Sequence, residues 1–257
     1  MKLWHETNGK GNDLVLLHGW GMNSAVWEPV IDRLDQHFTV TSVDLPGHGF
    51  STMPDAGATD LNDWSDAIAA VVPDNAIWLG WSLGGLLALQ AALNRITNIR
   101  ALFMVTATPS FIQRDGWQCA MPEQTLTQFS QNLKADVKTT LTRFLSLQIK
   151  GCDNARDLLK QLRSGFAERP PATFHALQTG LGFLRDTDLR QYLKEIDIPV
   201  HWLYGNRDTL TPACAADEIG AMMPAATSQI IKGAAHVPFL SHLEQVMPAL
   251  LELEQKA

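Results

Sequence analysis

The chain is organised around one stretch, Ile77-Trp78-Leu79-Gly80-Trp81-Ser82-Leu83-Gly84-Gly85-Leu86. An apolar run typical of a buried strand leads into Gly-Trp-Ser-Leu-Gly, and an apolar run that can form a helix follows. A serine in such a G-x-S-x-G pattern lies on a tight, strained turn with its hydroxyl clear of the backbone. The N-terminus of the following helix supplies partial positive charge where an oxyanion would form. We therefore predict that Ser82 is a nucleophile; the alternative is a plain strand–turn–helix with small residues.

Composition and charge narrow the class of protein. The 257 residues are 46% hydrophobic and 18% charged, as expected for a globular protein with a large core. The net charge of −7 argues against general nucleic-acid binding. No apolar run reaches the roughly 18 residues of a membrane span. The N-terminal residues lack the apolar region of a signal peptide. We expect a cytoplasmic monomer that does not enter a membrane.

The three cysteines, Cys119, Cys152 and Cys214, are scattered along the chain. Their number is odd and their spacing matches neither a metal site nor a disulfide framework. We predict three buried or incidental thiols, no metal site and no cofactor.

Strand and helix patterns alternate through the first 109 residues. Apolar strand patterns cover residues 14–17, 38–43, 76–79 and 100–105, with helical patterns between them. This alternation predicts an α/β fold with a mostly parallel sheet and helices on both faces. The pattern returns with strands at 199–205 and 227–231 and a final helix near 241–254.

Residues 110–186 differ from the rest of the chain. No strand pattern is present, and apolar residues recur at helical spacing, which predicts an inserted cap of three or four helices. The expected domains are therefore a core of residues 1–109 and 187–257 and a cap of residues 110–186. The cap holds ten Lys/Arg and seven Asp/Glu, whereas the core holds ten and twenty. The basic cap is either a solvated helical surface or a docking surface for an acidic partner.

Two side chains can activate the serine. Asp208 follows the strand that ends at Tyr204, and His236 follows the strand that ends at Ile231. The carboxyl ends of parallel strands meet at one edge of a sheet, so both should lie near Ser82. We predict that His236 takes the serine proton and that Asp208 orients the imidazole. Other acids and histidines have less suitable positions: Asp197 precedes its strand, Asp217 and His242 lie in helices, His201 lies within a strand, and His18 shapes the glycine loop.

The backbone amides of Trp20 and Leu83 are the expected oxyanion hole. Leu83 begins the helix after the serine, and Trp20 lies in the glycine loop after the first strand. The indoles of Trp20 and Trp81 either pack in the core or form a wall for an acyl chain.

These motifs carry a resemblance to a known superfamily. The segments that resemble the α/β-hydrolase superfamily are His18-Gly19-Trp20-Gly21, Asp44-Leu45-Pro46-Gly47-His48-Gly49, Gly80-Trp81-Ser82-Leu83-Gly84-Gly85, Leu203-Tyr204-Gly205-Asn206-Arg207-Asp208 and Ala235-His236. The order serine, acid, histidine is also that of this superfamily. Four segments are similar, more narrowly, to the pimeloyl-acyl-carrier-protein methyl ester esterases of biotin synthesis: Leu16-Leu17-His18-Gly19-Trp20-Gly21-Met22-Asn23, Ala76-Ile77-Trp78-Leu79-Gly80-Trp81-Ser82-Leu83-Gly84-Gly85, Arg143-Phe144-Leu145-Ser146-Leu147-Gln148 and Ala234-Ala235-His236-Val237-Pro238-Phe239.

The resemblance implies a substrate, a partner and a set of contacts. The implied reaction removes the methyl group from pimeloyl-acyl-carrier protein methyl ester and releases methanol. The substrate contacts would be Trp20, Ser82, Leu83, Phe144, Leu145, Ser146, Leu147, Gln148 and His236. The acidic carrier protein would dock on Arg143, Arg156 and Lys160 of the basic cap. A hydrolase of small free esters or of carbon–carbon bonds, and a non-catalytic receptor on the same scaffold, remain as alternatives.

Overall fold

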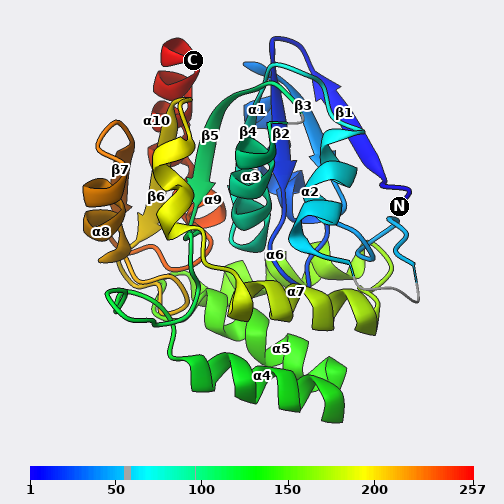
Figure 1. Ribbon diagram of the computed structural model, residues 1–257. Helices are drawn as coiled ribbons and strands as arrows, with labels where there is room; N and C mark the ends of the chain where they lie inside the picture. The colour runs from blue at the N-terminus through cyan, green and yellow to red at the C-terminus, as the bar shows by residue number, and fades with distance from the viewer. Residues whose placement is uncertain (55–58, 96) are drawn as a thin grey trace.

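A single mixed sheet forms the centre of the molecule. The computed structural model describes residues 1–54, 59–95 and 97–257. In these residues seven strands form a sheet of order β1-β3-β2-β4-β5-β6-β7, in which only β1 is antiparallel to its neighbour. The strands are β1 (His5–Gly9), β2 (Asn12–Leu17), β3 (Phe38–Val43), β4 (Ala76–Trp81), β5 (Ile99–Val105), β6 (Val200–Gly205) and β7 (Thr227–Ile231). The parallel strands all end at the lower edge in Figure 1.

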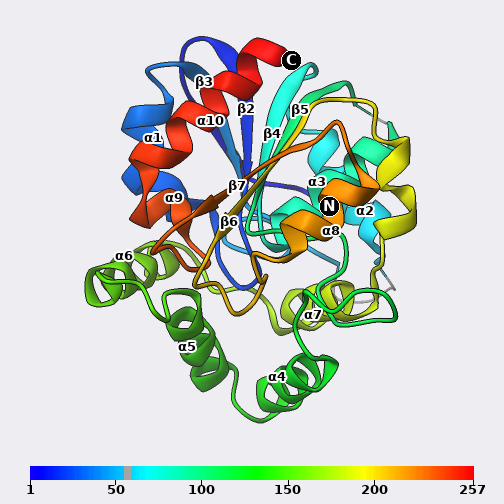
Figure 2. The same cartoon turned by 90° about the vertical axis from the view of Figure 1, so that its left-hand side faces the viewer.

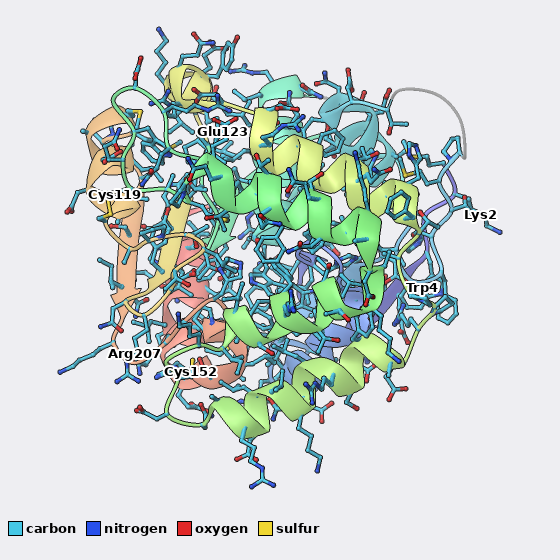
Figure 3. The ribbon with its side chains drawn as sticks, turned by 90° about the horizontal axis from the view of Figure 1, so that it is seen from below. Lys2, Trp4, Cys119, Glu123, Cys152 and Arg207 are labelled. Carbon is cyan, nitrogen blue, oxygen red and sulfur yellow. A yellow bond between two sulfur atoms is a disulfide. The ribbon has the colours of Figure 1, made fainter. Side chains whose placement is uncertain are left out.

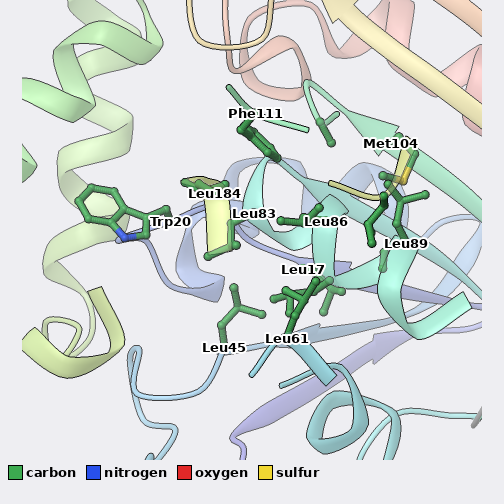
Figure 4. Close-up of a cluster of buried hydrophobic side chains, with 14 of the residues drawn as sticks. Leu17, Trp20, Leu45, Leu61, Leu83, Leu86, Leu89, Met104, Phe111 and Leu184 are labelled. Carbon is green, nitrogen blue, oxygen red and sulfur yellow. The ribbon is translucent and has the colours of Figure 1, made fainter. Parts of the chain in front are cut away.

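Helices cover both faces of the sheet (Figure 2). One face carries α1 (Glu28–Leu34), α9 (Pro238–Ser241) and α10 (Leu243–Lys256), and the other carries α2 (Leu61–Ala69), α3 (Leu83–Asn94) and α8 (Ala215–Met222). Short 3-10 helices occupy Ser24–Trp27 and Arg190–Glu195. Buried strand residues alternate between the two cores, because successive side chains of a strand point to opposite faces. Leu14 and Leu16 pack on the α1 and α10 side, whereas Leu17 packs with Leu83 and Leu86 on the α3 side (Figure 4).

Four helices lie between β5 and β6 and cover the carboxyl edge of the sheet (Figure 1). In the described part of the chain these are α4 (Glu123–Ala135), α5 (Val137–Gln148), α6 (Ala155–Ala167) and α7 (Phe174–Asp186). They fall within the segment predicted as a helical insertion. The division into a core of residues 1–109 and 187–257 and a cap of residues 110–186 remains our proposal.

The cap and the core are joined by a buried ion pair. Arg169, between α6 and α7, places Nη1 3.1 Å from Oδ2 of Asp44, which follows β3. The guanidinium also lies 3.6 Å from the ring centre of Trp4, within the range of a cation–π contact. Both charged side chains are buried, so the pair depends on its partners for solvation.

The prediction that all three cysteines are free thiols was wrong, because two of them form a disulfide. Cys119, in the loop before α4, is bonded to Cys214, just before α8, and their Cα atoms are 5.6 Å apart. Figure 3 labels Cys119 and, apart from it, Cys152, the free buried thiol. The bonded residues are 95 positions apart in sequence, so only the fold brings them together and local spacing could not reveal the pair.

Some element boundaries also differ from the predictions. Ser24 does not cap its helix: the Asn23 side chain accepts a hydrogen bond from the Ala25 amide, and the Ser24 hydroxyl donates to Asp44. His242 lies between α9 and α10 and not inside one final helix. The edge strand β1 was missed because all five of its residues are exposed and carry no apolar alternation.

Within the described residues, no helix combines the length and apolarity that crossing a bilayer requires.

Candidate active site

Ser82 occupies the turn between β4 and α3 in a strained backbone conformation. Its φ of 55° and ψ of −116° lie in a region that residues with a side chain rarely adopt. This turn is possible because glycines allow the backbones of β4, α3 and β2 to approach closely. A Cβ atom on Gly80 would lie 2.5 Å from the Gly85 Cα, and one on Gly84 would lie 2.3 Å from the Leu17 carbonyl oxygen. The geometry is that expected of a nucleophile presented at a strand-to-helix turn.

Asp208 and His236 form a buried hydrogen-bonded pair. The Nδ1–H of His236 donates to Oδ2 of Asp208 at 2.7 Å, and both side chains are 1% exposed. Asp208 is held in turn by the Thr211 hydroxyl, which donates to Oδ2 at 2.6 Å. Its other oxygen accepts from the Leu210 amide at 2.8 Å. The carboxylate therefore has fixed partners on both oxygens, and it fixes the proton of His236 on Nδ1.

The backbone of His236 is anchored from three elements. Its carbonyl accepts from Nε1 of Trp81 at 2.8 Å and from the Thr106 hydroxyl at 2.9 Å, and its amide donates to the Gln148 carbonyl at 3.0 Å. Its Nε2 is buried and has no hydrogen-bond partner among the residues that the structure describes. His236 and Ser82 line the same cavity, so Nε2 is free to receive the serine proton there. The Ser82–His236 hydrogen bond is not made in this structure, as is frequent before substrate binds.

Two neutral histidines hold the glycine loop after β2. The Leu45 amide donates to Nε2 of His18 at 2.9 Å, so Nδ1 carries the proton and donates to the Gly19 carbonyl at 2.8 Å. The Gly21 amide donates to Nε2 of His48. Burial lowers the pKa of His18 from 6.5 to about 3 and that of His48 to about 4, so both stay neutral. The predicted role of His18 in shaping this loop agrees with these contacts.

The hydrogen bond from His18 to the Gly19 carbonyl also orients the backbone amide of Trp20. The carbonyl of residue 19 and the N–H of Trp20 belong to one trans peptide and point in opposite directions. Gly19 passes close to the serine, because a Cβ atom there would lie 3.3 Å from the Ser82 Cβ. Among the described residues, neither the Trp20 nor the Leu83 amide donates a hydrogen bond. Both donors are therefore available, as a pair of oxyanion-hole amides must be.

The cavity beside Ser82 is small and apolar. Its volume is about 10 Å³, which holds no substrate without movement of the walls. Besides Ser82 and His236, its walls are Phe111, Met121, Leu126, Phe129, Phe144, Leu181, Leu184 and Leu210. Among the described residues, no Asp, Glu, Lys or Arg side chain lines this cavity, so it suits an uncharged acyl chain.

The predicted substrate contacts divide among several places. Ser82, Phe144 and His236 line the cavity. Ser146 and Leu147 line a groove on the outer surface of α4 and α5, and Leu145 packs in the core on the α1 side. Gln148 is fully buried, and its side-chain amide has no partner among the described residues.

The two tryptophans beside the site are buried behind the cavity wall. Trp20 donates from Nε1 to the Leu177 carbonyl and packs edge-on against Phe144, with ring centres 4.9 Å apart. Trp81 donates to the His236 carbonyl and lies in the core on the α1 side. Both indoles position other groups of the site and do not line the cavity, so the core-packing alternative describes them better.

The other acids and histidines stay away from Ser82. Asp197 pairs with Arg95 on the surface, and Asp217 lies in the first turn of α8. His201 is buried in β6 with its ring stacked on Phe103, and burial lowers its pKa to about 4. None of these residues lines the cavity.

Sequence reasoning missed most of the cavity wall. Leu126 and Phe129 on α4, and Leu181 and Leu184 on α7, are spaced three residues apart, so each pair lies on one helical face. That spacing is typical of buried helix faces, but it does not indicate which of these faces meets the serine. Thr211 was also missed, although a hydroxyl three residues after a candidate acid is a signal that could have been used.

The three predicted docking residues are exposed on the cap. Arg143 lies on α5, and Arg156 and Lys160 lie on α6. None of them forms an ion pair with another residue in the described ranges. Over the same ranges, no group of His, Cys, Asp or Glu side chains is arranged to hold a metal ion.

The fold and the site together define a class of protein. The sequence profile of the alpha/beta hydrolase family matches residues 14–249, and the chain belongs to this family. A solved structure, an esterase from Exiguobacterium antarcticum, superposes with a TM-score of 0.87 at 26% identity, covering 97% of this chain and 94% of that chain.

Within the family, the chain is similar over nearly its whole length to enzymes of one name. The pimeloyl-acyl-carrier-protein methyl ester esterase of Aliivibrio salmonicida is 39% identical over 248 residues, which are 96% of this chain and 94% of that protein. The enzyme of the same name from Salmonella paratyphi A is 42% identical over 253 residues, 98% of each chain. The resemblance inferred from the motifs is thereby confirmed over nearly the whole length.

Proposed function

We propose that this protein is a serine carboxylesterase that hydrolyses the methyl ester of pimeloyl-acyl-carrier protein to the free acid and methanol, a step of biotin synthesis. The observation that carries the proposal is that Ser82 and His236 line one apolar cavity and that Asp208 is hydrogen-bonded to His236 behind it. The similarity to esterases of that name supports the choice of substrate.

The first half of the reaction forms an acyl-enzyme. The Ser82 hydroxyl attacks the ester carbonyl while Nε2 of His236 takes its proton. Asp208 stabilises the resulting imidazolium, and the Trp20 and Leu83 amides stabilise the oxyanion of the tetrahedral intermediate. The bond to the methoxy group then breaks, and His236 returns the proton so that methanol leaves.

The second half regenerates the enzyme. His236 removes a proton from a water molecule, which attacks the Ser82 ester through a second tetrahedral intermediate. Collapse returns the proton to the serine oxygen and releases the pimeloyl carboxylate. Since the cavity is apolar, the newly formed charge disfavours retention of the product.

Recognition of the carrier is assigned to the cap. Arg143, Arg156 and Lys160 present three cations on α5 and α6 that form no ion pair with the described residues, in a chain whose overall charge is −7. An acidic carrier protein would meet attraction here and repulsion from most of the remaining surface.

The direct test supplies purified protein with pimeloyl-acyl-carrier protein methyl ester and measures methanol. The proposal predicts methanol with wild type. Rapid hydrolysis of small free esters or carbon–carbon substrates with no methanol from the carrier-linked ester would instead favour another hydrolase of this fold.

Docking is tested by charge reversal. Replacing Arg143, Arg156 and Lys160 with Glu should raise KM for the carrier-linked ester at least about tenfold and leave a short free ester unaffected, and added salt should reproduce the defect in wild type. The matched control makes the same net-charge change at the exposed residues Lys2, Lys10 and Lys194. Equal losses in both triple variants, or equal losses on both substrates, would reject the docking surface.

The proposal also includes a cytoplasmic monomer that needs no cofactor. One chain supplies Ser82, His236 and Asp208 as well as the Trp20 and Leu83 amides, so the site is complete in a monomer. Sedimentation analysis of the protein and activity after dialysis against a chelator would test it.

A further inference from the structure

The Cys119–Cys214 disulfide joins two of the loops that form the wall beside Ser82. Cys119 lies two positions before Met121, and Cys214 lies four positions after Leu210. Met121 and Leu210 both line the cavity that contains Ser82. Neither cysteine is among the described residues that line this cavity, so the bond fastens two parts of the wall to each other from behind.

The same bond ties the start of the cap to the core. The helix α4 begins at Glu123, four positions after Cys119, and it carries Leu126 and Phe129 into the cavity wall. Cys214 is the residue from which α8 starts on the core. Among the described residues, no hydrogen bond or ion pair joins residues 109–122 to residues 205–214. Apart from the packing of apolar side chains, the disulfide is therefore the link that holds these two segments together.

The disulfide can be reached from solvent, and breaking it would loosen a wall that has to move. The Cys214 residue is exposed and Cys119 is half-buried, whereas the free thiol of Cys152 is buried. Exposed disulfides are the ones that reductants cleave readily, and in the cytoplasm, where the proposed function places this protein, disulfides are mostly transient. The cavity of about 10 Å³ has to enlarge before it holds an acyl chain, and a cross-link between two parts of its wall opposes that change.

We propose that Cys119 and Cys214 form a reversible redox site: the disulfide keeps the cavity beside Ser82 closed, and reduction by a dithiol allows it to enlarge. One thiolate of the dithiol attacks the exposed Cys214 sulfur, and Cys119 leaves as a thiolate that takes up a proton. The second thiol of the reductant then attacks the mixed disulfide, which frees Cys214 as a thiol and converts the dithiol to a cyclic disulfide. The cysteine pair gains two electrons and two protons, all of them supplied by the dithiol.

This inference rests on the proposed function for the role of Ser82, so access to the serine is measured by labelling and not by turnover. Intact protein purified under oxidising conditions is compared with the same protein reduced by dithiothreitol. Each sample reacts with two fluorophosphonates, one with a long alkyl chain and one with a methyl group. We expect reduction to raise the ratio of long-chain to short-chain labelling rates at least about threefold, because a larger fraction of molecules has a cavity that accepts the chain. The hydrogen bonds of Asp208 and His236 involve neither cysteine, so a change in proton transfer is not expected.

Two cysteine variants separate this site from other effects of a reductant. The double variant Cys119→Ser with Cys214→Ser should show the ratio of the reduced protein whether or not dithiothreitol is present. The matched control is Cys152→Ala, which removes the free buried thiol and should keep the full difference between the two redox states. Circular dichroism at the assay temperature shows whether each sample is folded. Unfolding lowers labelling by both probes, so a loss of stability cannot raise the ratio.

Several results would overturn the redox site. They are an equal or lower ratio after reduction of wild type, a response to dithiothreitol that the double serine variant retains, and a response that Cys152→Ala abolishes. Mass spectrometry after thiol alkylation checks the bond itself, and free Cys119 and Cys214 thiols in protein exposed to oxidant would also reject the proposal. Labelling of Ser82 at equal ratios in both states would remove the redox site and retain the nucleophile. No labelling of Ser82 by either probe in either state would reject the nucleophile and the redox site with it.

Discussion

Reduction of the Cys119–Cys214 bond should lower the stability of the protein by a large and calculable amount. The bond closes a loop of 95 residues of sequence separation. In the chain-entropy description, a loop of about 100 residues restricts the unfolded chain by about 4.7 kcal/mol at 25 °C. Since the described hydrogen bonds of the Ser82 site involve neither cysteine, the folded state should keep its site when the bond is cut.

The assay is urea unfolding followed by circular dichroism, with and without a thiol reductant. For a protein of this size, a loss of about 4 to 5 kcal/mol corresponds to a melting temperature lower by about 10 °C or more. Cys119→Ser and Cys214→Ser should each reproduce the reduced protein and abolish its response to reductant.

Cys152 supplies the control. It is buried and unbonded, and burial raises the pKa of its thiol, so it should remain inert to oxidants. Cys152→Ala should therefore retain the full response to reductant. Identical unfolding curves with and without reductant, for protein purified under oxidising conditions, would refute the reasoning.

Three further predictions concern the site and the core. Thr211→Val should lower kcat/KM about tenfold without a matching loss of melting temperature, because the hydroxyl holds Asp208, and Thr211→Ser should restore it. Arg169→Gln should cost about 3 kcal/mol in urea unfolding, because it leaves the Asp44 carboxylate buried without its cation, and a loss below about 1 kcal/mol would count against this role. Stability should fall as the pH drops from about 6.5 to 4, because the unfolded chain binds a proton that the folded His201, with its pKa lowered to about 4, does not. His201→Gln should reduce that slope by about 1.4 kcal/mol per pH unit, and an unchanged slope would contradict the assignment.

The parts of the fold that follow local rules could be predicted from the sequence. The apolar runs of β2 to β6 are buried on both faces, and such runs predict parallel strands directly. Ser82, Asp208 and His236 each follow the end of a strand, so a parallel sheet brings them to one edge whatever the details of packing.

The parts that depend on tertiary packing could not. In the sequence, Leu126 and Leu181 cannot be distinguished from other buried helical leucines. Only the placement of α4 and α7 over the sheet edge brings them to the cavity beside Ser82. Cys119 and Cys214 meet because a loop of the cap segment folds back on the start of α8. The edge strand β1 is held by pairing with β3 and not by a buried face, so it leaves no apolar pattern.

The most direct test of the central claim is methanol release from the carrier-linked methyl ester by wild type and by Ser82→Ala, with both proteins shown to be folded by circular dichroism. We predict that wild type turns over and that the variant is slower by at least about a thousandfold, because among the described residues that line the cavity only Ser82 carries a hydroxyl. Hydrolysis by Ser82→Ala at the wild-type rate would contradict the account.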